Sequence, residues 1–544
     1  MINLLDFQKP QRYIGNEGNV SRKSPQGKIR ICLSFPDLYE VGMSNLGLRV
    51  IYGFLNEHED VACERVFMPG EDMANFLKKS GEPLFSLETK SPMQSFEVLG
   101  YHLGYELNAI NFLHMLNLGK VSLCKEKRGN LIVLAGGIMN PEPLAEFVDV
   151  FYLGEFEAGA GFFLEILRRH KAKNERLKAL SQVPGFYVPE FYSFDRSRGA
   201  LNIVKSFSQA QYPLKRSHVR NLDSAYYPSR WLTPLTSIVH DRAQVEIARG
   251  CPNSCNFCQA QAVYSPYRER SMRRVKELVT EIYKNSGYEN ISLLSLSASD
   301  YSSIENLIDE IYDFCKINRI GLSLPSLRID DITGRLCKQL SLLKKTSLTV
   351  ALEAARSPLR CLLNKNIAID KLFNAALTAR KLGMRHIKIY FMFGFEQEKE
   401  ADLRAIGGLI DKLRSVSKLN VYASINAFIP KPFSAWEKFS MQKKEILEDK
   451  KRLILESVPH RKDFKISFAP IEKSLIEAAI SRSGRSFSKV IYNAYVKGTR
   501  LNGYSERFSW DIWQESLDYA GLKLEDILNY KGPEFPWSFI KKNL

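Results

Sequence analysis

Between residues 244 and 430, short apolar runs alternate with helical stretches, and this alternation constrains the fold more than any other feature. Helical periodicity is centred near 273–286, 303–317, 331–344, 369–382 and 400–416. Six runs around these stretches have the length and β-branched content of buried strands: QVEIARG, ISLLSLS, GLSLPSL, SLTVALE, HIKIYFMFG and VYASINAFIP. Such alternation predicts parallel strand pairing. We expect a partial (β/α)6 barrel of the TIM type, with its chemistry at the carboxyl ends of the strands.

A second β/α alternation precedes this one. The strand-like runs are KIRICLSF, VACERVF, FEVLGYHLGY, LIVLAGG and VDVFYLG, with helices through SNLGLRVIYGFLNEH and NAINFLHMLNL. This order predicts a doubly wound, Rossmann-like α/β domain. Its ligand loops are expected after the strands, at Pro36–Gly47, Gly136–Pro143 and Gly154–Gly159.

These patterns divide the chain into four parts. The expected parts are a Rossmann-like domain over 1–174, a proline-punctuated connector over 175–235, the barrel over 236–438, and a C-terminal region over 439–544. The last region is mainly helical and basic, with one strand-like segment, FKISFAP. The fold class is therefore α/β throughout the first two domains.

Hydropathy and the distribution of cysteines indicate in which cellular compartment the protein is expected. No apolar run reaches the ~18 residues of a membrane span, and MINLLDFQKPQRYIG lacks the features of a secretion signal. Six of the nine cysteines stand singly, as expected for reduced core residues: Cys32, Cys63, Cys124, Cys315, Cys337 and Cys361. These features predict a soluble, cytoplasmic protein that does not associate with membranes.

The net charge of +17 is unevenly distributed. Residues 1–150 carry 15 Lys and Arg against 18 Asp and Glu, which leaves 62 against 42 for the rest of the chain. An excess of this size attracts polyanions such as RNA through counterion release. A merely solubilising surface is the other interpretation, because no block of five or six like charges occurs.

The stretch GCPNSCNFCQA places Cys251, Cys255 and Cys258 within eight residues, directly after the first barrel strand. Thiolates are the usual ligands of iron–sulfur clusters, and a C-x3-C-x2-C loop can bind three irons of a [4Fe–4S] cluster. The fourth iron then keeps an open position for a small chelating ligand. A structural zinc site is the alternative, but such sites usually combine two separated cysteine pairs, and the nearest histidine is His240, upstream.

A family resemblance accompanies this loop. RGCPNSCNFCQA resembles the cluster loop of radical S-adenosylmethionine enzymes, including the aromatic Phe257 before the last cysteine. Leu352 and Ala355, in TVALEAARSPLR, replace a proline and a glycine that are usual in one largely uncharacterised family of that superfamily. Other segments along most of the chain are similar to that family: RYIGNEGNV, FPDLYEVGMSNLG, CERVFMPGEDM, PLFSLET, GYELNAINFLHML, GGIMNPEPLAEFVD, SLSASDY, FMFGF and FIPKPFSAWE.

The resemblance implies both chemistry and architecture. In the family, a cobalamin-binding-like domain precedes the radical domain. In the superfamily, the open iron chelates the methionine moiety of S-adenosylmethionine. An electron, from a donor such as flavodoxin or ferredoxin, then splits that cofactor into methionine and a 5′-deoxyadenosyl radical, which abstracts hydrogen from the substrate.

The resemblance also indicates the residues around S-adenosylmethionine. Asp300 and two serines after the second strand are expected to accept hydrogen bonds from the ammonium group, Glu353 to contact the ribose or the ammonium, and Arg356 a carboxylate. In the alternative interpretation, Asp300 caps the next helix, Glu353 and Arg356 pair with each other, and Gly394 is a turn residue rather than a neighbour of adenine. The eight expected residues are Phe257, Ser297, Ser299, Asp300, Glu353, Arg356, Gly394 and Asn426.

Whether the N-terminal domain binds cobalamin is left open by its first loop. Tyr39, in PDLYEVGMSNLG, stands where many cobalamin domains carry a ligating histidine in an Asp-x-His-x-x-Gly loop. The loop keeps Asp37 and its glycines, so cobalamin could bind without a histidine from this loop. His102 and His114 fall in strand and helix patterns and are interpreted as core or surface residues. A substrate-binding or purely structural role fits the domain equally well.

The leading hypothesis is thus a radical S-adenosylmethionine enzyme that modifies an unknown substrate, with methylation or thiolation of RNA as one candidate reaction. Its expected partners are S-adenosylmethionine, an electron donor and RNA. A small-molecule, lipid or peptide substrate is the alternative within the same enzyme class. A non-enzymatic iron–sulfur protein that binds RNA is the alternative outside it.

Overall fold

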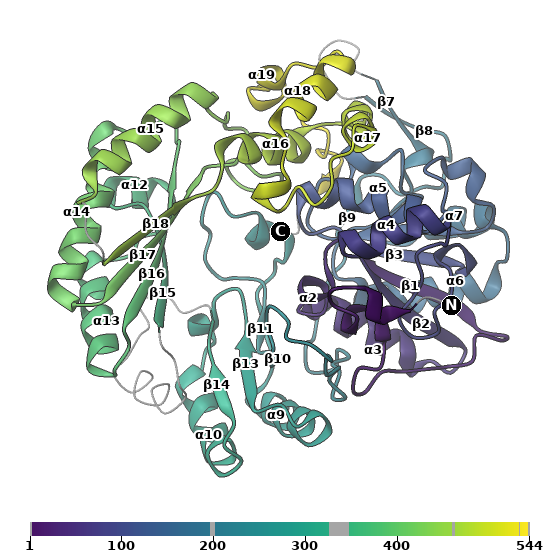
Figure 1. Ribbon diagram of the computed structural model, residues 1–544, viewed down its shortest axis with the longest axis horizontal. Helices are drawn as coiled ribbons and strands as arrows, with labels where there is room; N and C mark the ends of the chain where they lie inside the picture. Colours follow the sequence, from purple (N-terminus) through teal and green to yellow (C-terminus); the bar gives the residue numbers. More distant parts are fainter. Residues whose placement is uncertain (1–2, 196–201, 326–346, 460–462, 533, 542–544) are drawn as a thin grey trace.

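A parallel sheet with helices on both faces forms the N-terminal part of the molecule (Figure 1). The computed structural model describes residues 3–195, 202–325, 347–459, 463–532 and 534–541. The strand order is β2-β1-β3-β4-β5-β6, parallel except for the last pair. This order is flavodoxin-like and confirms the expected doubly wound, Rossmann-like class. The strands are β1 (Ile29–Phe35), β2 (Val61–Phe67), β3 (Val98–His102), β4 (Ile132–Gly136), β5 (Val150–Tyr152) and β6 (Phe186–Tyr187).

Local sequence determines where the helices of this domain begin and which side they bury. Asn45 caps α3, because its side chain accepts a hydrogen bond from the amide of Leu48. Nine of the ten residues of α5 are buried, since the sheet covers one side and a C-terminal helix packs on another. The helices are α3 (Leu46–Glu57), α4 (Glu71–Ser80), α5 (Ala109–Leu118), α6 (Ala160–Arg169) and α7 (Lys173–Leu180).

The central part is a partial β/α barrel built from two parallel sheets (Figure 1). All six expected strands are present and follow one another in the expected order. In β16, buried and half-buried residues alternate, so that one face of the strand packs against the helices and the other faces the barrel interior. The first sheet contains β10 (Ala243–Glu246), β13 (Asn290–Leu294) and β14 (Gly321–Ser323). The second contains β15 (Ser347–Glu353), β16 (His386–Phe393), β17 (Asn420–Ala427) and β18 (Phe464–Phe468).

Four of the five expected barrel helices match closely, and the fifth, near 331–344, lies outside the described residues. The strand β18 differs from the expectation. It was assigned to the C-terminal region, yet it pairs in parallel with β17 and extends the barrel sheet beyond residue 438. The helices are α9 (Met272–Ser286), α10 (Ile304–Ile317), α12 (Ser357–Leu362), α13 (Ile369–Lys381), α14 (Glu400–Ser417) and α15 (Lys444–Ser457).

The C-terminal helices connect the barrel to the N-terminal sheet (Figure 1). Lys431, after β17, forms ion pairs of 2.8 Å with Glu106 of the N-terminal domain and with Glu477 of α16. The Tyr504 hydroxyl donates to Asp37 at 2.9 Å. This region therefore connects the two β/α units through ion pairs and a hydrogen bond. Its helices are α16 (Ile471–Arg482), α17 (Ser488–Val496), α18 (Trp510–Tyr519) and α19 (Leu524–Leu528).

The connector and the isolated cysteines depart from expectation in detail. The strand-like segment near 186 joins the first sheet as its antiparallel edge, while β7 (Tyr192–Asp195) and β8 (Asn202–Lys205) form a separate ribbon. Cys124 and Cys361 are exposed, so the core interpretation is wrong for both. Of the other single cysteines, Cys337 lies outside the described residues and three are buried: Cys32, Cys63 and Cys315. None of the helices in the described ranges is both long and apolar enough to cross a bilayer.

Candidate functional site

The three clustered cysteines lie at the mouth of the barrel. Their loop runs from β11 (Ala248–Arg249), which pairs with β12 (Arg268–Glu269) beside the end of β10, to the short helix α8 (Gln259–Val263). None of the three forms a disulfide, and all three are partly exposed. The amide of Gln261 donates to the sulfur of Cys258 at 3.4 Å, and burial raises the pKa of the Cys258 thiol.

The donor set suits an iron–sulfur cluster better than zinc. Three thiols on one loop match the ligand type that such clusters use, and within the described residues no histidine is grouped with them as a metal ligand would be. In the described part of the chain, no three His, Cys, Asp or Glu side chains are grouped so that they could hold a metal ion. Cluster binding would therefore require Cys251, Cys255 and Cys258 to turn toward a common centre.

Hydrogen bonds from two neighbouring segments hold the cysteine loop. The amide of Asn256 donates to the carbonyl of Leu363 at 3.1 Å, and the amide of Trp436 donates to the carbonyl of Asn256 at 3.0 Å. The Asn364 side chain donates to the carbonyl of Ser254 at 2.8 Å. The loops after β15 and β17 therefore fix this segment even though few residues of the loop are in regular structure.

Asp300 lies beside the cysteine loop. It belongs to a 3-10 turn after β13, together with Ser299, and its carboxylate accepts a hydrogen bond from the Asn253 side chain. The next helix, α10, is capped at Ser303 without a side-chain hydrogen bond, so the helix-cap interpretation of Asp300 is wrong. Ser297 precedes the same turn and is buried. These three residues stay candidates for binding the ammonium group.

Glu353 ends β15 with a positive φ of 67°, a conformation that non-glycine residues seldom adopt. Its carboxylate pairs with Lys365 at 2.8 Å, and Arg356 pairs with Asp402 at 3.2 Å. The alternative interpretation, in which Glu353 and Arg356 pair with each other, is therefore wrong. The ammonium of Lys365 also lies 5.8 Å from the ring centroid of Phe257, so it connects Glu353 with the cysteine loop.

The two remaining predicted residues differ in accessibility. Gly394 has φ of 92°, its amide donates to Glu398 at 2.8 Å, and a Cβ added to it would approach Leu447 to 2.6 Å. These contacts favour the turn interpretation over a position beside adenine. Asn426 lies on the half-buried face of β17, with Ser424, and faces the barrel interior. Its role stays a prediction.

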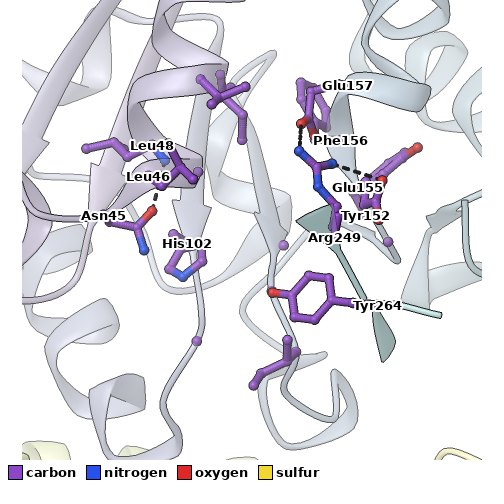
Figure 2. Close-up of a pocket in the computed structure, with 18 of the residues that line it drawn as sticks. Asn45, Leu46, Leu48, His102, Tyr152, Glu155, Phe156, Glu157, Arg249 and Tyr264 are labelled. Carbon is purple, nitrogen blue, oxygen red and sulfur yellow. Dashed lines mark hydrogen bonds and ion pairs between the residues drawn. The ribbon is translucent and has the colours of Figure 1, made fainter. Parts of the chain in front are cut away.

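A large cavity lies between the N-terminal sheet and the barrel (Figure 2). It has a volume of about 670 Å³ and begins at the carboxyl ends of β3, β4 and β5, where glycine loops were expected to hold a ligand. Ile31 of β1, Leu55 of α3 and Phe163 of α6 line its apolar part, between the sheet and these two helices. The opposite wall comes from the barrel and includes Arg249 and Tyr264.

Arg249 connects the two walls through ion pairs. Its guanidinium lies 2.9 Å from Glu155, 3.0 Å from Glu157 and 2.8 Å from Glu246. Arg268 adds a second contact to Glu155 at 2.7 Å. Burial would raise the pKa of Glu155, but the hydrogen bond from Arg268 and the charge of Arg249 lower it below its usual value. The residue directly before the cysteine loop is thereby anchored to the N-terminal domain.

Tyr39 and two histidines of the N-terminal domain, His102 and His114, occupy different environments. Tyr39 is buried and donates to Glu17 at 3.0 Å, and it does not line the cavity. His114 is buried in α5, as a core histidine. His102 lines the cavity and is visible in Figure 2, so it is neither a core nor a plain surface residue. Its strand pattern gave no sign of this, because the opposite wall comes from a distant part of the chain.

Comparison with known proteins agrees with these features. The family model of radical SAM proteins, N-terminal, matches residues 47–189, and that of the radical SAM superfamily matches residues 245–410. The chain is 24% identical over 500 residues to the uncharacterised protein MJ0966 of Methanocaldococcus jannaschii, which covers 90% of this chain and 98% of the relative.

Two solved structures are similar to this fold. The radical S-adenosylmethionine methyltransferase TsrM from Kitasatospora setae, solved with cobalamin and a [4Fe–4S] cluster, has a TM-score of 0.50 at 11% identity, over 75% of this chain and 74% of TsrM. The cobalamin-dependent S-adenosylmethionine radical enzyme OxsB has a TM-score of 0.49 at 12% identity, over 91% of this chain and 71% of OxsB. The first similarity confirms the α/β architecture.

Proposed function

Because the chain belongs to the radical S-adenosylmethionine superfamily, we propose that Cys251, Cys255 and Cys258 hold a [4Fe–4S] cluster for reductive cleavage of S-adenosylmethionine. The bound cluster supplies one electron and an open iron site for the methionine moiety. With that electron, the C5′–S bond of S-adenosylmethionine would be cleaved to methionine and a 5′-deoxyadenosyl radical, which would take a hydrogen atom from the substrate. A flavodoxin or ferredoxin would return the electron to the cluster.

The observation that carries this proposal is the cysteine loop itself. Three thiols lie on one loop at the carboxyl end of a parallel barrel, where such folds place their chemistry. Hydrogen bonds from two other loops of the barrel mouth hold its backbone. Around it, Asp300, Glu353 and Lys365 supply charged groups that can bind the ammonium and carboxylate of the cofactor.

Anaerobic reconstitution with iron and sulfide tests this proposal. We expect about four irons per chain, a visible iron–sulfur absorption band, and 5′-deoxyadenosine formation that depends on dithionite. The Cys255→Ala variant should lose the iron, the absorption band and 5′-deoxyadenosine formation, whereas Cys124→Ala, which removes an exposed cysteine of the N-terminal domain, should keep all three. Wild-type protein that binds zinc and forms no 5′-deoxyadenosine would overturn the proposal.

We further propose that the interdomain cavity binds a corrin such as cobalamin. The cavity of about 670 Å³ is lined by residues of both β/α units, including apolar side chains of β1, α3 and α6. Such an apolar lining suits the hydrocarbon edge of a corrin macrocycle. Gly136 and Gly137 border the cavity without side chains, which leaves the backbone open to a large ligand. The TsrM structure, which contains cobalamin, shares this architecture.

Corrin binding is tested directly with hydroxocobalamin. We expect the wild-type protein to retain about one corrin per chain after gel filtration. The Gly136→Val substitution should abolish retention without unfolding the chain, because a Cβ at this position meets nothing closer than 3.5 Å. Gly161→Ala, on the exposed side of α6, is the control and should retain the corrin. Wild-type protein without retained corrin would refute the proposal.

For the substrate, we propose a polyanion of the RNA class that is methylated or thiolated. The support is the net charge of +17, whose excess lies beyond residue 150. RNA binding should then weaken as salt is raised, with log Kd linear in log salt concentration. Affinity for RNA that does not depend on salt would favour a small-molecule, lipid or peptide substrate. Enzyme that forms no 5′-deoxyadenosine but still binds RNA would favour a non-enzymatic iron–sulfur protein.

A further inference from the structure

His102 is held in a fixed orientation at the edge of the interdomain cavity. It is the last residue of β3, and its ring stacks on Phe35 with the centroids 5.3 Å apart and the planes 9° from parallel. Figure 2 shows the ring on the side of the N-terminal sheet, across the cavity from Arg249 and Tyr264. Stacking on a buried ring restricts rotation of the imidazole, so its nitrogens have a defined direction.

Neither ring nitrogen of His102 makes a hydrogen bond within the described part of the chain. The His102 side chain is half-buried and lines the cavity, so water or a ligand in the cavity can reach its ring nitrogens. Burial also lowers the pKa of His102 to about 4. At neutral pH the imidazole is therefore uncharged and has a free lone pair, which is the form that binds metal ions.

Gly104 keeps the space beside this lone pair open. It lines the same cavity, and a Cβ added to it would lie 2.7 Å from Nε2 of His102. Any other residue at this position would cover that nitrogen. The φ of Gly104 does not lie in the left-handed region, so backbone conformation does not require glycine here. Access to Nε2 of His102 therefore explains why a glycine, which has no side chain, occupies position 104.

We propose that Nε2 of His102 is the axial ligand to the cobalt of a corrin bound in the interdomain cavity, an inference that rests on the corrin site proposed above. The strand β3 would thus supply the histidine that the loop after β1 lacks, where Tyr39 is instead bound to Glu17. A nitrogen ligand from the carboxyl end of β3 reaches the same edge of the sheet, because all parallel strands end there.

Electron paramagnetic resonance of the protein loaded with cob(II)alamin tests this assignment. One axial nitrogen-14 splits each cobalt line into three, and a nitrogen-15 splits it into two. We expect three lines in unlabelled protein and two when the protein contains [15N]histidine. Three lines in labelled protein would mean that the benzimidazole base of the cofactor stays bound, and absence of nitrogen splitting would mean no nitrogen ligand. Either result would overturn the assignment.

Variants separate this inference from corrin binding itself. His102→Ala should bind the corrin more weakly and lose the nitrogen splitting, and splitting that persists in this variant would overturn the assignment. Gly104→Ala keeps the imidazole but places a methyl group against Nε2, so it should also lose the splitting. His240→Ala changes the other histidine of the cavity wall and should keep the nitrogen splitting. Loss of the splitting in that variant would overturn the assignment to His102. If the wild-type protein retains no corrin, both the corrin site and this inference are refuted.

Discussion

Gln259, the residue directly after the last clustered cysteine, donates a hydrogen bond from its side chain to the carbonyl of Ile138 at 2.9 Å. Ile138 belongs to the loop after β4, next to Gly137, whose φ of 145° is open only to glycine. The candidate cluster loop and the glycine loop of the N-terminal sheet are therefore in direct contact. This side chain therefore adds to the ion pairs of Arg249 with Glu155 and Glu157, which join the same two units.

The Gln259→Ala substitution should lower the free energy of unfolding by about 1–2 kcal/mol, because it leaves the carbonyl of Ile138 without its partner. Urea denaturation measures this difference. Gln261→Ala is the matched control, since this side chain is two residues away on α8, and it should change the value by less than ~0.5 kcal/mol. Equal losses in the two variants would show that the contact between the two loops contributes nothing.

Glu155 makes the stability of the interface depend on pH. Its pKa is lowered in the folded protein, because the contacts with Arg268 and Arg249 outweigh burial. A lowered folded pKa gives stability that is present above the unfolded value of ~4.3 and is lost as pH falls through the folded pKa. Glu155→Gln should therefore cost about 2 kcal/mol at pH 7 and less at pH 3.5, which lies below the unfolded pKa of ~4.3, so that the unfolded wild-type chain is largely protonated there.

Urea unfolding at both pH values measures the effect of Glu155→Gln. Glu165→Gln serves as the comparison, because Glu165 pairs with Arg169 on the exposed surface of α6 and should contribute ~0.5 kcal/mol or less at either pH. A penalty for Glu155→Gln that stays constant between pH 7 and pH 3.5 would contradict the assignment of the charge to Glu155.

The parts of this molecule that follow from local sequence were predictable. Strand and helix periodicity placed all six barrel strands, because each is a continuous run with its own pattern. The spacing of Cys251, Cys255 and Cys258 is likewise a local property. The strand β18 was misplaced, because α15 separates it from β17 and its parallel pairing depends on the whole sheet.

Partners from distant parts of the chain account for the remaining differences. Glu353 and Arg356 are neighbours in sequence, yet their ion-pair partners are Lys365 and Asp402, brought near by the helices after two strands. His102 ends a strand whose pattern is that of any buried central strand. Its cavity exists only because the barrel lies opposite, and no periodicity in either segment encodes that contact.

Lys365 and Glu353 provide a test of coupling beside the cysteine loop. Their ion pair is 2.8 Å long, and the side chains are 13% and 11% exposed. Lys365→Met should lower the unfolding free energy by about 2 kcal/mol, because it leaves a largely buried carboxylate without its partner. Adding Glu353→Gln should recover part of this loss, with a coupling energy of about 1–2 kcal/mol in a double-mutant cycle. Strictly additive losses would refute the pairing.

Substitution of Gly394 distinguishes a role in the turn after β16 from a role in binding adenine. Its φ of 92° and the approach of a new Cβ to Leu447, at 2.6 Å, predict that Gly394→Ala lowers the unfolding free energy by about 2 kcal/mol. Because that Cβ points at Leu447, the Kd of S-adenosylmethionine for folded protein should stay unchanged in equilibrium dialysis. Gly408→Ala, with nothing within 4 Å, should stabilise α14 by ~0.5–1 kcal/mol. A tenfold weaker cofactor affinity in Gly394→Ala would instead place adenine against this turn.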